Sequence, residues 1–148
     1  MSVTAGFTKS YRIVVDRELK NGNNGQSKHW SGSHKERQGW TQAINNAYAI
    51  STNGTEFPLD TFLACSAPDD LQGLVITRFL AKGQRKWDAD SVLRGNAKQL
   101  VDSLIEAGVA RDDSPRYIDF VYGLQDDSKR GELESGYVTI DVYEKGGR

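Results

Sequence analysis

The run LVITRFL at residues 74–80 constrains the fold of this chain more than any other stretch. A strand with one face in water alternates apolar and polar residues, whereas this run is nearly all apolar. Strands with this composition are buried on both faces. The run therefore predicts a strand in the interior of a sheet, and the basic turn AKGQRK follows directly after it.

Two other segments, residues 10–17 and 137–144, have the period-two pattern of strands with one buried face. Their β-branched content supports the same assignment. The residues that we expect to face the core are Tyr11, Ile13, Val15, Val138, Ile140 and Val142.

Residues 116–124 also alternate and predict a further strand. Its inward face would carry Ile118, Phe120, Tyr122 and Leu124. We expect this strand and the last one to pair as an antiparallel hairpin with a long loop. Their outer faces would then present Tyr117, Val121, Tyr137, Thr139 and Tyr143.

Two amphipathic helices are predicted between the strands. Ser33 would cap the first helix, with Glu36 completing a capping box, and Asp90 or Ser91 would cap the second. Gly108 is placed to end the second helix in the left-handed conformation. The expected buried stripes are Trp40, Ile44, Ala47 and Tyr48, then Leu93, Ala97, Leu100, Val101 and Leu104, with Ile105 beside them.

The order of these elements predicts one α/β domain covering residues 1–148, a two-layer sandwich in which a mixed sheet packs against two main helices. Residues 53–72 predict only a short strand or helical turn that covers the core. A formal net charge of −1 argues against a generally polycationic nucleic-acid coat. The single cysteine, Cys65, suits a reducing cytoplasm, and we expect no membrane-spanning segment.

Two acidic pairs lie on either side of the second predicted helix. In an extended WDADS segment, Asp88 and Asp90 share a face, and the helix would return Asp112 and Asp113 to the same neighbourhood. Converging carboxylates suit Mg²⁺, which prefers oxygen ligands. The same patterns are also common as helix caps and solvated turns.

Cations accompany these acids on the second predicted helix. Asp90, Arg94, Lys98 and Asp102 are spaced by four residues and would lie along one helix edge. This edge is either a ladder of surface ion pairs or a pair of cations placed where a scissile phosphate would need them.

The central stretch resembles the RusA-like Holliday-junction resolvases of bacteria and their phages. That family has a strand, a basic turn, D-x-D-N-L, a helical lysine, a D-x-L…A-G segment and a final D-D. The corresponding residues here are Asp88-Ala89-Asp90-Ser91-Val92, Lys98, DSLIEAG at residues 102–108, and Asp112-Asp113. Upstream, the residues KHW at 28–30 and the following helix with Arg37 and Trp40 resemble a phage branch of the family less strongly, and the whole resemblance covers about two-thirds of the chain.

The resemblance implies a homodimeric, Mg²⁺-dependent endonuclease that resolves four-way DNA junctions in recombination and repair, in the cytoplasm of a bacterium or of a phage-infected host. Asp88, Asp90 and Asp113 would hold one or two Mg²⁺ ions, with Mn²⁺ able to substitute, and Lys98 would bind the scissile phosphate or position the attacking water. Asp112 is an alternative to Asp113. The implied DNA contacts are Lys28, which lies in a polar, glycine-rich loop at residues 21–33, and Lys82, Arg85, Lys86 and Arg94.

Two departures from the family pattern leave alternatives open. Ser91 replaces the usual asparagine, and the longer interval from Asp90 to Lys98 makes Arg94 a competitor for the role of the lysine. A catalytically silent DNA-binding phage accessory protein with the same fold is the main alternative. A Ca²⁺-binding loop opened at Asp88 is disfavoured, because Val92, Leu93 and Gln99 stand where acid, glycine and glutamate belong.

Overall fold

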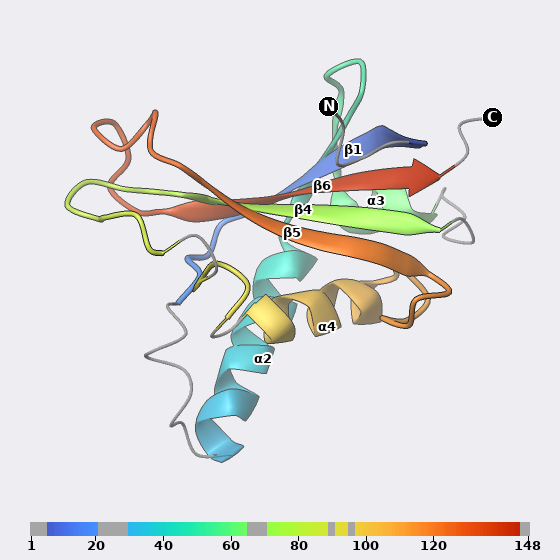
Figure 1. The fold of residues 1–148 in the computed structure, drawn as a ribbon, viewed down its shortest axis with the longest axis horizontal. Helices are drawn as coiled ribbons and strands as arrows, with labels where there is room; N and C mark the ends of the chain where they lie inside the picture. The colour runs from blue at the N-terminus through green and yellow to red at the C-terminus, as the bar shows by residue number, and fades with distance from the viewer. Residues whose placement is uncertain (1–5, 21–29, 65–70, 89–90, 95–96, 146–148) are drawn as a thin grey trace.

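The computed structural model describes residues 6–20, 30–64, 71–88, 91–94 and 97–145. In this part of the chain, one six-stranded mixed sheet has the order β3-β2-β1-β6-β4-β5, and α2 and α4 lie together against one of its faces (Figure 1). The predicted mixed sheet with two main helices is therefore confirmed. The elements are β1 (Phe7–Val15), α2 (Trp30–Asn45), β2 (Tyr48–Ser51), β3 (Glu56–Pro58), α3 (Leu59–Ala64), β4 (Gln72–Phe79), α4 (Ala97–Ala107), β5 (Ile118–Asp126) and β6 (Tyr137–Lys145).

The strand β4 lies in the interior of the sheet, as its apolar sequence predicts. It pairs in parallel with β5 and antiparallel with β6, so that it separates these two strands. The predicted hairpin of β5 and β6 is therefore wrong. Parallel neighbours need a crossover, and α4 supplies it between β4 and β5. Pairing β4 on both edges buries the most apolar strand of the chain.

The core lies between the sheet and the two main helices. Every inward residue predicted for β1 and β6 is buried, and Trp40, Ile44, Leu100 and Leu104 face them from α2 and α4. The predicted strand or helical turn within residues 53–72 is present as β3 and α3. None of the described helices is both long enough and apolar enough to cross a membrane.

Ile118 at the start of β5 is buried in the core as predicted, but from Phe120 onward the two faces of the strand are reversed from the prediction. Val121 packs against the core, whereas Phe120 lies over Gly73 on the opposite face of the sheet. There the Phe120 ring contacts Phe7 edge-on at 5.1 Å between ring centroids and stacks on Tyr122 at 4.8 Å. Gly73 leaves the space that this ring occupies, because a Cβ atom at that position would come within 2.0 Å of Phe120 Cζ.

The first helix begins earlier than predicted. Because α2 starts at Trp30, Ser33 lies inside the helix and is not its N-cap. Glu36 is buried and forms ion pairs with Lys20 and Arg17, which explains an acidic side chain on the inner side of this helix. Tyr48, predicted for the buried stripe, instead begins β2 and is half exposed.

The second helix begins later than predicted. Ser91 and Arg94 belong to a turn closed by hydrogen bonds from Ser91 N to Asp88 O (2.9 Å) and from Arg94 N to Ser91 O (3.1 Å). Ser91 is thus not the cap of α4, Arg94 is not on its edge, and Leu93 is exposed rather than part of its stripe. The prediction that Gly108 ends the helix is confirmed, because its φ is +102°.

Candidate functional site

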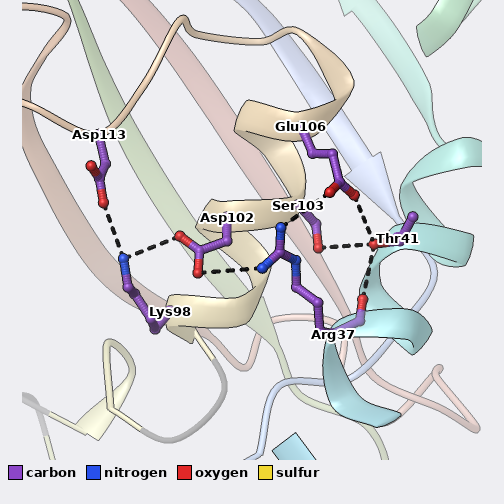
Figure 2. A network of polar contacts seen from close by, with 7 residues as sticks. All are labelled: Arg37, Thr41, Lys98, Asp102, Ser103, Glu106 and Asp113. Carbon is purple, nitrogen blue, oxygen red and sulfur yellow. Dashed lines mark hydrogen bonds and ion pairs between the residues drawn. The ribbon is translucent and has the colours of Figure 1, made fainter. Parts of the chain in front are cut away.

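Lys98 and Asp113, two residues predicted to share the site, are in contact. Lys98 lies in the first turn of α4, and its Nζ is 3.0 Å from Asp113 Oδ2 and 3.1 Å from Asp102 Oδ1 (Figure 2). The hydrogen bond to Asp113, followed by that to Asp102, raises the pKa of Lys98 above its usual value. The ammonium group of Lys98 therefore stays positively charged at neutral pH.

The adjacent Asp112 is used differently. Its Oδ1 accepts a hydrogen bond from Ser114 N at 2.6 Å, so the side chain closes a local turn before β5. This hydrogen bond, with a further one to the Ser114 side chain, lowers the pKa of Asp112. Of the two neighbouring aspartates, Asp113 is therefore the one that faces Lys98, and Asp112 is the one that shapes the turn.

A network of charges extends from this pair to α2. Arg37 Nη1 is 3.8 Å from Asp102 Oδ2, and Arg37 Nη2 is 3.2 Å from Glu106 Oε2 (Figure 2). Asp102 thus lies between two cations, which restrains the carboxylate that contacts Lys98. A surface pocket of about 330 Å³ adjoins the network, lined by Arg37, Asp102, Ile105, Glu106, Asp112 and Asp113.

The sequence reasoning missed Arg37 and Glu106 as members of this network. A signal was present in the spacing, because Asp102 and Glu106 are four residues apart and share an edge of α4. Only the packing of α2 on α4 brings Arg37 to that edge.

Asp88 lies at the end of the turn that leaves β4. Its side chain is exposed and makes no hydrogen bond or ion pair with any described residue, while its backbone carbonyl accepts from Ser91 N. No such contact joins it to Lys98 or Asp113. Asp90, the other predicted ligand, lies outside the described residues, and so does Lys28.

The basic turn that carries Asp88 is fastened to its surroundings at its first half. Gln84 Oε1 accepts from Ala81 N at 2.8 Å, and Gln84 Nε2 donates to Glu18 Oε2 at 3.1 Å. Lys82 N also donates to Leu133 O at 3.0 Å. These bonds tie the turn to the segment after β1 and to the connection between β5 and β6, and give it a defined shape.

Three predicted DNA contacts project from this turn. Lys82, Arg85 and Lys86 are all exposed. Lys82 pairs with Glu134 at 2.8 Å and Lys86 lies 4.0 Å from Asp127, both acids in the connection between β5 and β6. Exposed ion pairs of this kind are weak, so a phosphate could displace either acid. Arg94 is exposed on the next turn.

The donor chemistry of the predicted metal ligands fits a hard cation. Asp88 offers a carboxylate with no protein partner among the described residues, and Asp113 offers one shared with Lys98. Within the part of the chain that is described, no three His, Cys, Asp or Glu side chains are grouped closely enough to hold a metal ion. The predicted set also includes Asp90, which lies outside the described residues.

No model of a known protein family matches the sequence, and a search of curated proteins gives no match either.

Proposed function

We propose that this protein is a Mg²⁺-dependent, structure-selective endonuclease of the RusA-like type that cuts four-way DNA junctions in recombination and repair. The observation that supports this most directly is the contact between Lys98 and Asp113, which are 15 residues apart in the chain. The resemblance had placed these two residues in one site through the helical lysine and the final acidic pair. A ladder of unrelated surface charges would not require them to meet.

Each residue has a distinct role in the proposed reaction. Asp88, Asp90 and Asp113 would hold one or two Mg²⁺ ions, with Mn²⁺ able to replace them. When bound, such an ion supplies an activated water and neutralises charge on the reacting phosphate. Lys98 would hold the scissile phosphate through its ammonium group. Asp102 keeps Lys98 oriented along α4, because it contacts the same Nζ from the next turn of the helix.

DNA binding would depend mainly on phosphate contacts. Lys82, Arg85 and Lys86 lie on the turn just before Asp88, and Arg94 lies just after it, so the cations flank the proposed site in sequence. Lys28 would add a further phosphate contact. The DNA affinity that such phosphate contacts supply falls as the salt concentration rises. Recognition of the branch point would then depend on the shape of the DNA.

We further propose that the active form is a homodimer. Paired nicks in opposed strands call for two sites related by a two-fold axis. The face of the sheet away from α2 and α4 carries the exposed side chains of Tyr122 and Leu124, and both belong to β5, an edge strand. An apolar edge strand is a surface that a second chain can cover.

The decisive experiment compares two adjacent aspartates. Purified wild-type protein should cut a synthetic four-way junction in Mg²⁺ or Mn²⁺ and leave a linear duplex of the same sequence intact. Asp113→Asn should abolish cutting and leave junction binding unchanged or tighter, whereas Asp112→Asn should retain most of the activity. If Asp113→Asn cuts the junction at the wild-type rate, Asp113 is not a ligand of the proposed metal site. Binding without cutting by the wild type would favour the catalytically silent accessory protein.

A further inference from the structure

A buried cation lies beneath the turn that carries Asp88. Arg78 is on the helix-facing side of β4, and only 6% of it is exposed. Burial lowers the pKa of Arg78, and the charge of Glu18 opposes this shift. Within the described residues, no carboxylate lies at ion-pair distance from its guanidinium. Burying a charge without an ion-pair partner is costly in free energy. The buried guanidinium of Arg78 is therefore stabilised by its hydrogen bonds instead.

Those hydrogen bonds lead to the second half of the turn and to the neighbouring strand β5. Arg78 Nη1 donates to Arg85 O at 3.0 Å and to Gln125 Oε1 at 2.9 Å. The guanidinium carbon is also 3.7 Å from the centroid of the Trp87 ring, which is a close cation–π contact. The guanidinium therefore holds the backbone at Arg85 and the side chain of Trp87.

Gln125 holds the same segment from the neighbouring strand. Its Oε1 accepts from Trp87 N at 2.7 Å, and its Nε2 donates to Trp87 O at 2.9 Å. The side-chain amide thus pairs with both backbone polar groups of Trp87, as a further strand residue would. Arg78 and Gln125 are direct partners in the register of β4 and β5, so the sheet itself places the two side chains together.

We propose that Arg78 and Gln125 act as positioning residues that fix the backbone of Trp87 and thereby aim the Asp88 carboxylate; this inference rests on the proposed function. The Asp88 side chain has no partner of its own among the described residues, so its direction follows from the backbone that precedes it. Groups that orient a metal-binding or catalytic side chain commonly control activity without touching substrate.

The effect of this pair is confined to the second half of the turn. The first half is fastened independently by the bonds of Gln84 to Ala81 and Glu18. Loss of the Gln125 bonds should therefore loosen residues 85–88 and leave the preceding residues ordered. A local effect of this kind can be separated from a general loss of stability.

The test uses Gln125→Met, which keeps the length of the side chain and removes both bonds to Trp87. The matched control is Gln72→Met, a buried glutamine at the opposite end of β4. Amide exchange in residues 85–88 should accelerate at least about tenfold in Gln125→Met and stay unchanged in Gln72→Met. Single-turnover cutting at saturating junction should fall about 10- to 100-fold in Gln125→Met, with an unchanged junction Kd.

A double-mutant cycle isolates the action through Asp88. Gln125→Met should weaken Mn²⁺ affinity, measured by calorimetry without DNA, about 10-fold or more in the wild-type background and not at all in Asp88→Asn. If Gln125→Met fails to fold, Gln125→Glu serves instead. It keeps the acceptor for Trp87 N, replaces the donor to Trp87 O with a carboxylate oxygen that repels the carbonyl, and should show an effect in the same direction.

The outcomes separate this inference from the proposed function. Faster exchange with unchanged cutting and Mn²⁺ affinity would make the pair purely structural and overturn the inference. Unchanged exchange would overturn it as well. If the wild type cuts no junction, the proposed function fails and the Mn²⁺ cycle alone decides the inference. Absence of any Mn²⁺ binding by the wild type would overturn both.

Discussion

Replacing Lys98 with alanine should separate catalysis from stability. The Lys98 side chain is 66% exposed, and its partners Asp113 and Asp102 are 55% and 28% exposed. Double-mutant cycles on exposed ion pairs of this kind give about 0.2–1 kcal/mol, so the free energy of unfolding should fall by about 1 kcal/mol or less. The fold does not depend on this ammonium group.

The same change should have a much larger effect on the reaction. A cation aimed at the reacting phosphate acts mainly in the transition state. Removing one such preorganised group costs about 100- to 1,000-fold in rate, or about 2.7–4 kcal/mol. Arg94→Ala should be milder, because Arg94 lies on the turn before α4 rather than on the helix edge that faces Asp113.

Single-turnover cutting of a synthetic junction in Mg²⁺, with chemical unfolding of the same preparations, measures both quantities. Lys35→Ala, at an exposed position of α2, controls for the loss of one positive charge. A greater loss of rate in Arg94→Ala than in Lys98→Ala would transfer the role to Arg94. If Lys98→Ala lowers the free energy of unfolding by as much as it raises the activation free energy of cutting, the claim that Lys98 serves catalysis rather than stability is refuted.

Three other predictions follow from the fold. Gly73→Ala should lower the free energy of unfolding in urea by about 1–3 kcal/mol, because its Cβ would collide with the Phe120 ring; Gly131→Ala, which meets nothing within 4 Å, should change it far less. Burial raises the pKa of Tyr11 from its usual 10.0. The neutral phenol therefore contributes its full share of the folding free energy below about pH 10, and this contribution is lost as the pH rises above that value. Tyr11→Phe should flatten the fall in urea midpoint above about pH 10, and an equally steep fall in the variant would contradict this reasoning. Light scattering at micromolar concentration should give about twice the chain mass, and Leu124→Ser should shift the protein toward monomer; a wild-type monomer, free and on a junction, would remove coordinated resolution from the proposal.

Local sequence patterns were sufficient for much of the fold. The alternation in β1 and β6, the apolar run of β4 and the C-terminal end of α4 at Gly108 were all predicted from neighbouring residues. In the candidate site, the resemblance placed Lys98 and an aspartate of the final acidic pair in one neighbourhood, and Lys98 and Asp113 are in contact. The strand and helix-end features depend on residues within a few positions of one another. The meeting of Lys98 with Asp113 depends only on the helix α4 that joins them.

The helix starts were less predictable from the sequence. Ser33 with Glu36 matches a capping box, yet α2 has already begun at Trp30, and Glu36 pairs with Arg17 and Lys20. Such a pattern is only a local preference. Ion pairs from the segment after β1 compete for the same glutamate, and these partners are 16 and 19 residues away in the chain.

Strand order and the faces of β5 were decided only by the tertiary structure. Phe120, Val121 and Tyr122 are all apolar or aromatic, so the sequence does not distinguish the inner from the outer face of this strand. The choice depends on Gly73 of β4, which opens space for Phe120, and on Val92 and Leu93, which pack beside Gly123. The burial of Arg78 likewise requires Gln125 from the adjacent strand. Each of these outcomes depends on contacts between residues that are distant in the chain. Such contacts stabilise the protein only after the strands have paired, so the local sequence does not reveal them.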